Sequence, residues 1–263
     1  MNDPLVSVIY PVFNDLPADI HQSLTSIIDQ DYKNLEIIII DDSTNPDSIN
    51  AIDKFSYDRR VLILRENSTK GLAQALNNGI KIAKGKYIAR ADADDIQYKK
   101  RIRTQVEYME LHAEIGILGC NVNYIDSEGK FVKKRTFPEE HQHISKYLHL
   151  RNPICHSVVM IRKQVLDEIG AYDADFRRAE DYELWFRADK NNVLLFNLQE
   201  VLLDYKMASS VKRDDLNWKM NLILKKKYFS GKHFFESLMG IASVYMYLYT
   251  PKSIQSFIYN KLA

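Results

Sequence analysis

The sequence is poor in cysteine, because its 263 residues include only Cys120 and Cys155, which lie far apart in the chain. Such a pair excludes a disulfide-stapled scaffold and a cysteine-based metal site. A low number of cysteines, none of them at paired spacing, is typical of proteins in the reducing cytosol. We therefore expect a cytoplasmic protein.

Long hydrophobic runs are also absent. No stretch reaches the roughly 18 consecutive apolar residues of a membrane-spanning helix, and the nearest candidate, 234–249, is interrupted by Glu236, Gly240 and Ser243. The first apolar run has no positively charged segment before it and is broken by Pro11, so it predicts a strand and not a signal peptide.

An excess of either charge is missing as well. The 36 basic residues nearly balance the 35 acidic ones, and a formal charge of +1 gives no reason to expect a nucleic-acid partner. With 46% hydrophobic and 27% charged residues, the chain can bury a core. Its length suits one large domain, or one domain with an appendage.

The first half of the chain alternates short apolar runs with helical spacing. This alternation predicts parallel βαβ units in an α/β protein. The expected strands are 5–10, 35–40, 61–64 and 87–91, and the expected helices are 20–28, 48–55 and 72–83.

The second half is less regular. It predicts helices at 101–111, from Lys163 and at 180–188, and strands at 115–125, 131–137, 157–161, 193–196 and 201–205. Only helical patterns follow from Asp214 onward.

Polar side chains follow three of the early strands, at Pro11–Asn14, Asp41–Ser43 and Asp92–Asp95. Ligands of open α/β sheets bind beyond the carboxyl ends of the strands, so we expect these groups to share one crevice. The crowded acids at 92–95 have two interpretations. One is a site for Mg²⁺ or Mn²⁺ shared with a phosphate, and the other is an acidic turn that caps a helix starting near Gln97.

Several motifs then occur in a recognisable order. They are Val6–Asn14, Ile39–Ser43, Gly71–Gly79, Gly85–Ile88, Asp92–Asp95 and Ala179–Trp185. Over roughly residues 5–207 the chain resembles the family-2 glycosyltransferases of GT-A fold. The resemblance implies a Rossmann-like α/β fold with a mixed, mostly parallel sheet flanked by helices. We expect this domain at 1–208 and a C-terminal helical segment at 209–263.

The resemblance also implies a nucleotide site. Pro11, Asn14 and Asp42 match positions that contact the nucleotide, with Asp42 hydrogen-bonding the base. Side chains alternate along a strand, so Asp41 and Asp42 should point apart. The resemblance selects Asp42, which leaves Asp41 as a structural acid.

The acidic tetrad divides in the same way. Asp92 matches a residue near the ribose or the metal, and Asp94 matches the ligand of a divalent ion, Mn²⁺ or Mg²⁺, that bridges the donor diphosphate. Asp181 matches the catalytic base. His156 and Glu180 are expected on the acceptor side.

These residue types suit the chemistry that the resemblance implies, which is inverting transfer of a hexose from a nucleotide diphosphate, usually UDP. A divalent cation offsets the charge that develops on the leaving diphosphate. A carboxylate removes the proton of the attacking hydroxyl. The expected acceptor is a lipid-linked glycan hydroxyl in the biosynthesis of a surface polysaccharide such as O-antigen or capsule.

Three alternatives stay open. They are a sugar nucleotidyltransferase, which expects a glycine-rich loop where this chain has Pro11–Asp15, a phosphohydrolase, and an inactive nucleotide-sugar-binding relative. One departure from the family favours the last. Many relatives carry Tyr-Arg-x-His where this chain has Tyr205–Ala208, so Lys206, Ser209, Ser210 or Lys212 would have to replace the missing groups.

The C-terminal segment combines aromatic-rich helices with a basic stretch between Lys206 and Lys232. It could pack on the catalytic domain, form a homodimer contact, or lie on the anionic inner face of the cytoplasmic membrane as a peripheral anchor.

Overall fold

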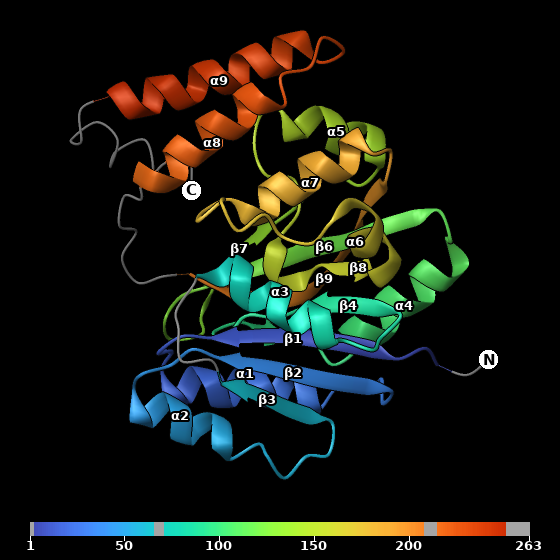
Figure 1. The fold of residues 1–263 in the computed structure, drawn as a ribbon, viewed down its shortest axis with the longest axis vertical. Coiled ribbons are helices and arrows are strands. Elements are labelled where there is room, and N and C mark those ends of the chain that lie inside the picture. The colour runs from blue at the N-terminus through green and yellow to red at the C-terminus, as the bar shows by residue number, and fades with distance from the viewer. Residues whose placement is uncertain (1–2, 66–70, 208–214, 251–263) are drawn as a thin grey trace.

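The computed structural model of the protein describes residues 3–65, 71–207 and 215–250. Within these residues nine strands form one sheet, with the order β3-β2-β1-β4-β8-β6-β9-β5 and β7 paired to β6 (Figure 1). The strands are β1 Val6–Val12, β2 Leu35–Asp41, β3 Val61–Arg65, β4 Tyr87–Arg90, β5 Ile96–Gln97, β6 Ile115–Ile125, β7 Phe131–Arg135, β8 Met160–Arg162 and β9 Leu194–Lys206.

The sheet is mixed and mostly parallel, as expected. β1 pairs in parallel with β2 and β4, and β2 with β3, which is the βαβ half of the fold. β8 is antiparallel to both β4 and β6, whereas β6 and β9 are parallel to each other. The short strands β5 and β7 are antiparallel to their neighbours.

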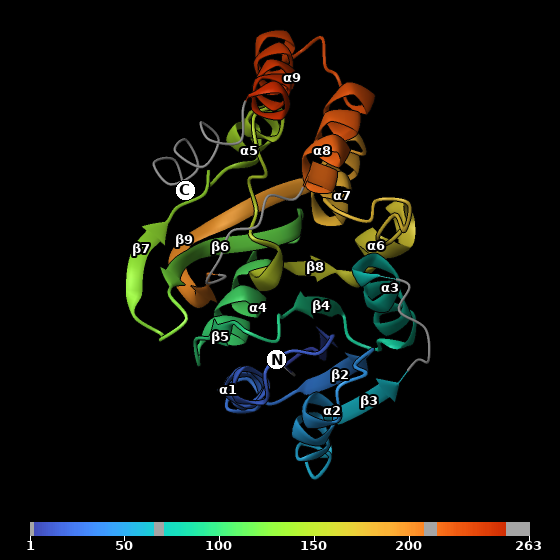
Figure 2. The same cartoon turned by 90° about the vertical axis from the view of Figure 1, so that its left-hand side faces the viewer.

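Helices cover both faces of the sheet (Figure 2). One face carries α1 Pro17–Ile28, α2 Pro46–Asp53 and α4 Arg101–Leu111, and the other carries α3 Leu72–Ile82, α6 Lys163–Ile169 and α7 Glu180–Lys190. The remaining helices are α5 His141–Leu148, the 3-10 turn His156–Val158, α8 Asp215–Lys227 and α9 Phe234–Tyr249.

Strand alternation explains why there are two cores. In β1, Val8 and Tyr10 join the core under α1, whereas Ile9 between them joins the core under α3. Successive side chains point to opposite faces of a strand, so both faces of a central strand must be apolar. Gly79 lets α3 approach this sheet, because a Cβ there would lie 2.7 Å from the Cδ1 of Ile40.

The structure corrects several expected elements. Residues 96–97 form strand β5, so no helix starts near Gln97, whereas the helix expected at 101–111 is present as α4. The two strands expected at 193–196 and 201–205 are one long strand, β9. Helix α5 was not expected, and much of 157–161 is a 3-10 turn followed by β8.

The C-terminal helices α8 and α9 lie side by side at the end of the molecule away from β3 (Figure 1). Leu224 of α8 is fully buried in the core that also contains Trp185. On α9, a Cβ at Gly240 would lie 1.8 Å from the carbonyl oxygen of His149, so the absence of a side chain allows this helix to pack closely. Among the described residues, no helix has both the length and the apolar character that crossing a membrane requires.

Candidate functional site

The three polar strand ends do converge. They line a cleft of about 560 Å³, which we call the strand-end cleft. Its walls come from the ends of β1, β2 and β4, the start of α3, and the loop before α7. The lining residues are Pro11, Val12, Phe13, Asp15, Asp42, Gly71, Leu72, Ala75, Asp92, Ala93, Asp94 and Arg178.

Acidic groups crowd one side of this cleft. Partial burial, together with the negative charges of Asp92 and Asp15, raises the pKa of Asp94 to about 6. Burial also raises the pKa of Asp15, although the backbone N–H of Phe13 donates to its carboxylate at 3.0 Å and opposes the shift. Clustered carboxylates whose charges repel one another are suited to a hard cation.

The acids would supply only part of a metal's ligands. Among the described residues, no group of three His, Cys, Asp or Glu side chains is arranged to hold a metal ion. Carboxylate oxygens fit Mg²⁺ or Mn²⁺, and Mg²⁺ commonly takes one or two carboxylates together with substrate phosphates and water. Asp94 and Asp92 therefore fit a cation that arrives with a phosphate ligand.

Asp95 is not a helix cap. It is completely buried, and its carboxylate accepts a hydrogen bond of 2.9 Å from the backbone N–H of Lys206. The residue that precedes α4 is Lys100, and no side-chain hydrogen bond caps that helix. Burial, then the charges of Asp92 and Asp94, raise the pKa of Asp95 well above its usual value. Asp95 thus ties the acidic loop to the end of β9.

The acids at the end of β2 take different roles, as strand alternation predicts. Asp41 is buried and forms an ion pair of 2.9 Å with Arg65. Asp42 lies in the strand-end cleft, and so does Pro11 at the end of β1. Asn14 is not among the cleft's lining residues, and its side-chain oxygen accepts the backbone N–H groups of Thr44 and Asn45, both at 2.8 Å.

A second cavity of about 460 Å³, the central cavity, adjoins the first, because Asp92 lines both. The Asp92 carboxylate also accepts a hydrogen bond from the buried guanidinium of Arg90. The remaining walls come from β6, β7, β9, the loop 151–157 and the start of α7. The other lining residues are Tyr124, Arg135, Phe137, Arg151, Asn152, Ile154, Cys155, His156, Ser157, Glu180, Asp181 and Tyr205.

Glu180 and Asp181 open helix α7 on the wall of the central cavity. The side-chain N–H of Asn152 donates to the Asp181 carboxylate at 2.6 Å. Burial raises the pKa of Asp181, and this hydrogen bond opposes the shift. Burial and then the charge of Asp181 raise the pKa of Glu180 to about 7. This acid pair therefore takes up protons at a higher pH than exposed carboxylates do.

His156 lies in the same cavity, where its Nε2 is 2.8 Å from the hydroxyl oxygen of Tyr172. Burial and then the charge of Arg90 hold the pKa of His156 well below its usual value. Its ring is consequently neutral at physiological pH. It serves as a hydrogen-bonding group and not as a cation.

Only part of the segment that departs from the family's Tyr-Arg-x-His pattern lies among the described residues. The Lys206 side chain extends to Asp19, with Nζ 2.5 Å from the carboxylate, and does not line the strand-end cleft. Ala208, Ser209, Ser210 and Lys212 lie outside the described residues.

Sequence reasoning missed several lining residues. Asp15 and Arg178 line the strand-end cleft, and Arg151 and Asn152 line the central cavity. Asp15 continues the polar end of the first strand, so its position was a usable signal. The sequence around Asn152 gave no such signal, because this residue lines the site through its hydrogen bond to Asp181, 29 positions away in the chain.

The site thus consists of two connected cavities with an acidic cluster in one and a buried acid pair in the other. Such an arrangement can bind an anionic ligand through a cation and present a carboxylate base to a neighbouring group.

Comparison with known proteins agrees with this arrangement. The sequence profile of Glycosyl transferase family 2 matches residues 7–170. The chain is 34% identical over 210 residues to UDP-Glc:alpha-D-GlcNAc-diphosphoundecaprenol beta-1,3-glucosyltransferase WfaP of Escherichia coli, covering 79% of each chain. It is 29% identical over 216 residues to amylovoran biosynthesis glycosyltransferase AmsE of Erwinia amylovora, covering 81% of this chain and 80% of that protein.

Solved structures show the same fold. The mannosyltransferase PcManGT from Pyrobaculum calidifontis, in complex with GDP-Man and Mn²⁺, matches with a TM-score of 0.68 at 17% identity, covering 95% of this chain and 71% of that one. Residues 1–349 of TarS from S. aureus, in complex with UDP-GlcNAc, match with a TM-score of 0.69 at 15% identity, covering 95% and 77%. The fold is GT-A, and the chain belongs to glycosyltransferase family 2.

Proposed function

We propose that the protein transfers a hexose, with inversion, from UDP to a hydroxyl of a lipid-linked glycan during the synthesis of a surface polysaccharide. The observation that carries this proposal is the connection of the two cavities through Asp92. It allows a donor bound at the strand ends to extend its sugar toward Asp181.

The strand-end cleft suits the nucleotide diphosphate. Pro11 and Asp42 would contact the nucleotide, and Asn14 would act by holding the loop 43–45 beside it. Asp94 and Asp92 would hold Mn²⁺ or Mg²⁺ together with the diphosphate. The cation's chemistry there is to offset the negative charge of the leaving diphosphate.

The central cavity suits the reacting groups. The ionised Asp181 accepts the proton of the acceptor hydroxyl as that oxygen forms its bond to the anomeric carbon. The bond between this carbon and the diphosphate oxygen breaks on the opposite face, which inverts the configuration. Asn152 holds the carboxylate in place, while Glu180 and the neutral His156 lie on the acceptor side of the cavity.

Two observations support the choice of substrates. The relative WfaP is named for UDP-Glc and for an acceptor sugar linked through diphosphate to undecaprenol. In this chain, Arg151 is exposed beside the central cavity and has no carboxylate within ion-pairing distance among the described residues, which suits an anionic acceptor.

Calorimetry with UDP, GDP, CDP and ADP, each with and without Mn²⁺, tests the donor half of the proposal. We expect UDP to bind most tightly and to require the metal. Asp94→Asn should abolish the metal-dependent part of binding because it removes a ligand. Asp167→Asn, which changes an exposed acid on α6, is the matched control and should bind as the wild type does. Binding of UDP that is unaffected by Mn²⁺ would contradict the metal site.

A further inference from the structure

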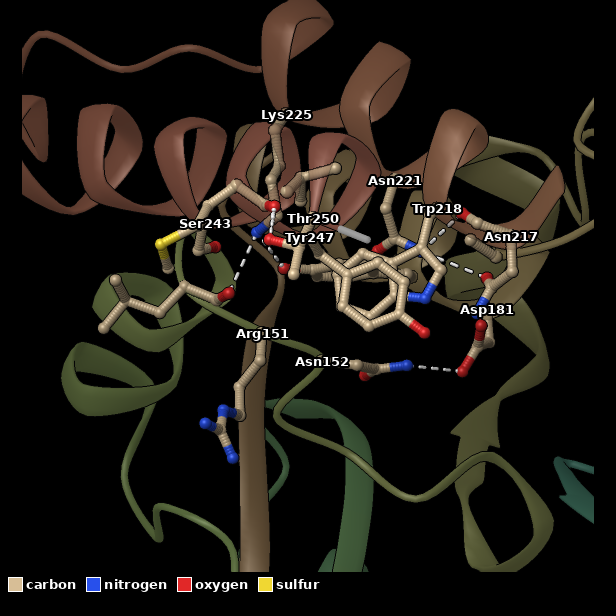
Figure 3. Close-up of a pocket in the computed structure, with 15 residues that line it drawn as sticks. Arg151, Asn152, Asp181, Asn217, Trp218, Asn221, Lys225, Ser243, Tyr247 and Thr250 are labelled. Carbon is tan, nitrogen blue, oxygen red and sulfur yellow. Dashed lines mark hydrogen bonds between the residues drawn. The ribbon is translucent and has the colours of Figure 1, made fainter. Parts of the chain in front are cut away.

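A third cavity, of about 530 Å³, lies between the C-terminal helices and the start of α7 (Figure 3). We call it the helical cavity. It shares Arg151, Asn152 and Asp181 with the central cavity. Most of its other lining residues come from α8 and α9, which lie beyond the residues that the family profile matches.

A pair of stacked aromatic rings forms one wall of this cavity. Trp218 of α8 and Tyr247 of α9 have ring centroids 3.8 Å apart and planes inclined by 18°. Both residues are half-buried. In Figure 3 the stacked rings lie beside Asn152 and Asp181. The two helices thus present a flat aromatic surface next to the acid that we propose as the base.

Amide groups accompany the aromatic wall. Asn217 and Asn221 line the cavity from α8, where the Asn221 side chain donates to the backbone and side-chain oxygens of Asn217 at 2.8 and 3.0 Å. Asn152 lines it from the loop after α5, with its side-chain N–H donating to Asp181. Lys225 is occupied, since its ammonium donates to the carbonyl oxygens of His149 and Leu150 at 2.9 and 3.1 Å.

This combination matches the chemistry of a pyranose ring. A pyranose has a face of C–H groups that packs on a flat aromatic surface, and hydroxyls around its edge that exchange hydrogen bonds with amides. Apolar and aromatic walls with a few placed polar groups are the usual composition of small-ligand sites.

The order of the cavities identifies which sugar this would be. Asp92 joins the strand-end cleft to the central cavity, and Asp181 joins the central cavity to the helical cavity. With the nucleotide in the first and the anomeric carbon in the second, the acceptor reaches Asp181 from the third. We propose that the helical cavity binds a pyranose ring of the acceptor glycan against the Trp218–Tyr247 wall, an inference that rests on the proposed function.

Saturation-transfer NMR with the methyl glycosides of glucose, galactose, N-acetylglucosamine and N-acetylgalactosamine, in the presence of UDP and Mn²⁺, tests this site. We expect at least one glycoside to bind, and Trp218→Ala and Tyr247→Ala to weaken its binding about fivefold each, the scale of a lost aromatic contact. Trp218→Phe retains a flat ring and should bind nearly as the wild type does.

The control is Phe235→Ala, which removes a ring that is 74% exposed on α9 and does not line the cavity. It should leave glycoside binding unchanged, and UDP affinity should be unchanged in all four variants. Unaltered glycoside binding in Trp218→Ala and Tyr247→Ala, or no glycoside binding to a protein that binds UDP, would overturn the proposal. Trp218-dependent glycoside binding without UDP binding would retain the saccharide site and reject the proposed donor.

Discussion

The acid pair at the start of α7 shows how surroundings change the behaviour of single residues. Glu180 is buried, and its pKa is raised to about 7 by burial and by the charge of Asp181. Asp181 has a raised pKa for the same main reason. A base must be deprotonated to act, so the protonation of this pair sets the lower pH limit of the proposed reaction.

We expect transfer to rise with pH as the pair loses its protons and to level off above neutral pH. Asn152→Ala removes the hydrogen bond that lowers the pKa of Asp181, so this pKa should rise and the rise in rate should move to higher pH. A profile of kcat against pH for both proteins measures this shift.

Asp181→Asn is the companion variant, because it should bind the donor normally and transfer nothing at any pH. An unshifted profile in Asn152→Ala would mean that this hydrogen bond does not set the pKa of the base. Normal turnover by Asp181→Asn would remove Asp181 from the role of base.

At the scale of elements, helix α8 supports the loop that carries Asn152. Lys225 is buried and donates to the carbonyl oxygens of His149 and Leu150 and, at 2.9 Å, to the hydroxyl of Tyr182. These carbonyls follow the end of α5, where the backbone oxygens have no partner within the helix. The C-terminal segment therefore stabilises the loop that carries Asn152.

Lys225→Met should lower the free energy of unfolding by about 2–3 kcal/mol, since it leaves buried carbonyls without a donor. It should also slow transfer, because Asn152 lies in the released loop. Urea denaturation and kcat measure the two effects. Lys226→Met is the matched control: this neighbouring lysine is exposed and donates to Tyr245, so its loss should change stability by less than about 0.5 kcal/mol. Equal effects of the two variants would contradict the supporting role of Lys225.

At the scale of the molecule, the C-terminal helices present an apolar surface. Exposed side chains on α9 include Phe235, Leu238, Met239, Met246 and Tyr249. Lys219 and Lys226 are exposed on α8, and Lys226 lies against Tyr245 of α9. Apolar side chains beside basic ones suit an anionic membrane surface, which is where a lipid-linked acceptor would be found.

We expect the protein to sediment with vesicles that contain anionic lipid and to be released as the salt concentration rises, because screening weakens the contribution of the lysines. Phe235→Ser combined with Met239→Ser should reduce binding, whereas Leu111→Ser, which changes an exposed apolar residue on α4, should not. If the protein does not sediment with the vesicles and instead dimerises through α9, the apolar surface is an interface between copies of the chain.

Much of the first half of the fold was predictable from local patterns. Buried parallel strands are short apolar runs, and the apolar residues of the connecting helices recur every three or four positions. The wrong predictions of strands and of side-chain roles occurred where contacts with residues distant in the sequence decide the local structure. The pairing of β9 with β6 continues the strand across residues 197–200, which have no strand pattern of their own. Asp95 has the sequence context of a cap, yet it bonds to Lys206 at the far end of the domain.

By itself, the sequence determined the family, the order of the elements in the βαβ half and the acids at the strand ends, because local patterns and motifs carry that information. Only the tertiary structure decided that Asp92 and Asp181 each join two cavities, that Asn152 holds Asp181, and that Trp218 stacks on Tyr247 beside them. Those relations depend on distances between residues remote in the chain, and such distances exist only once the helices have packed on the sheet.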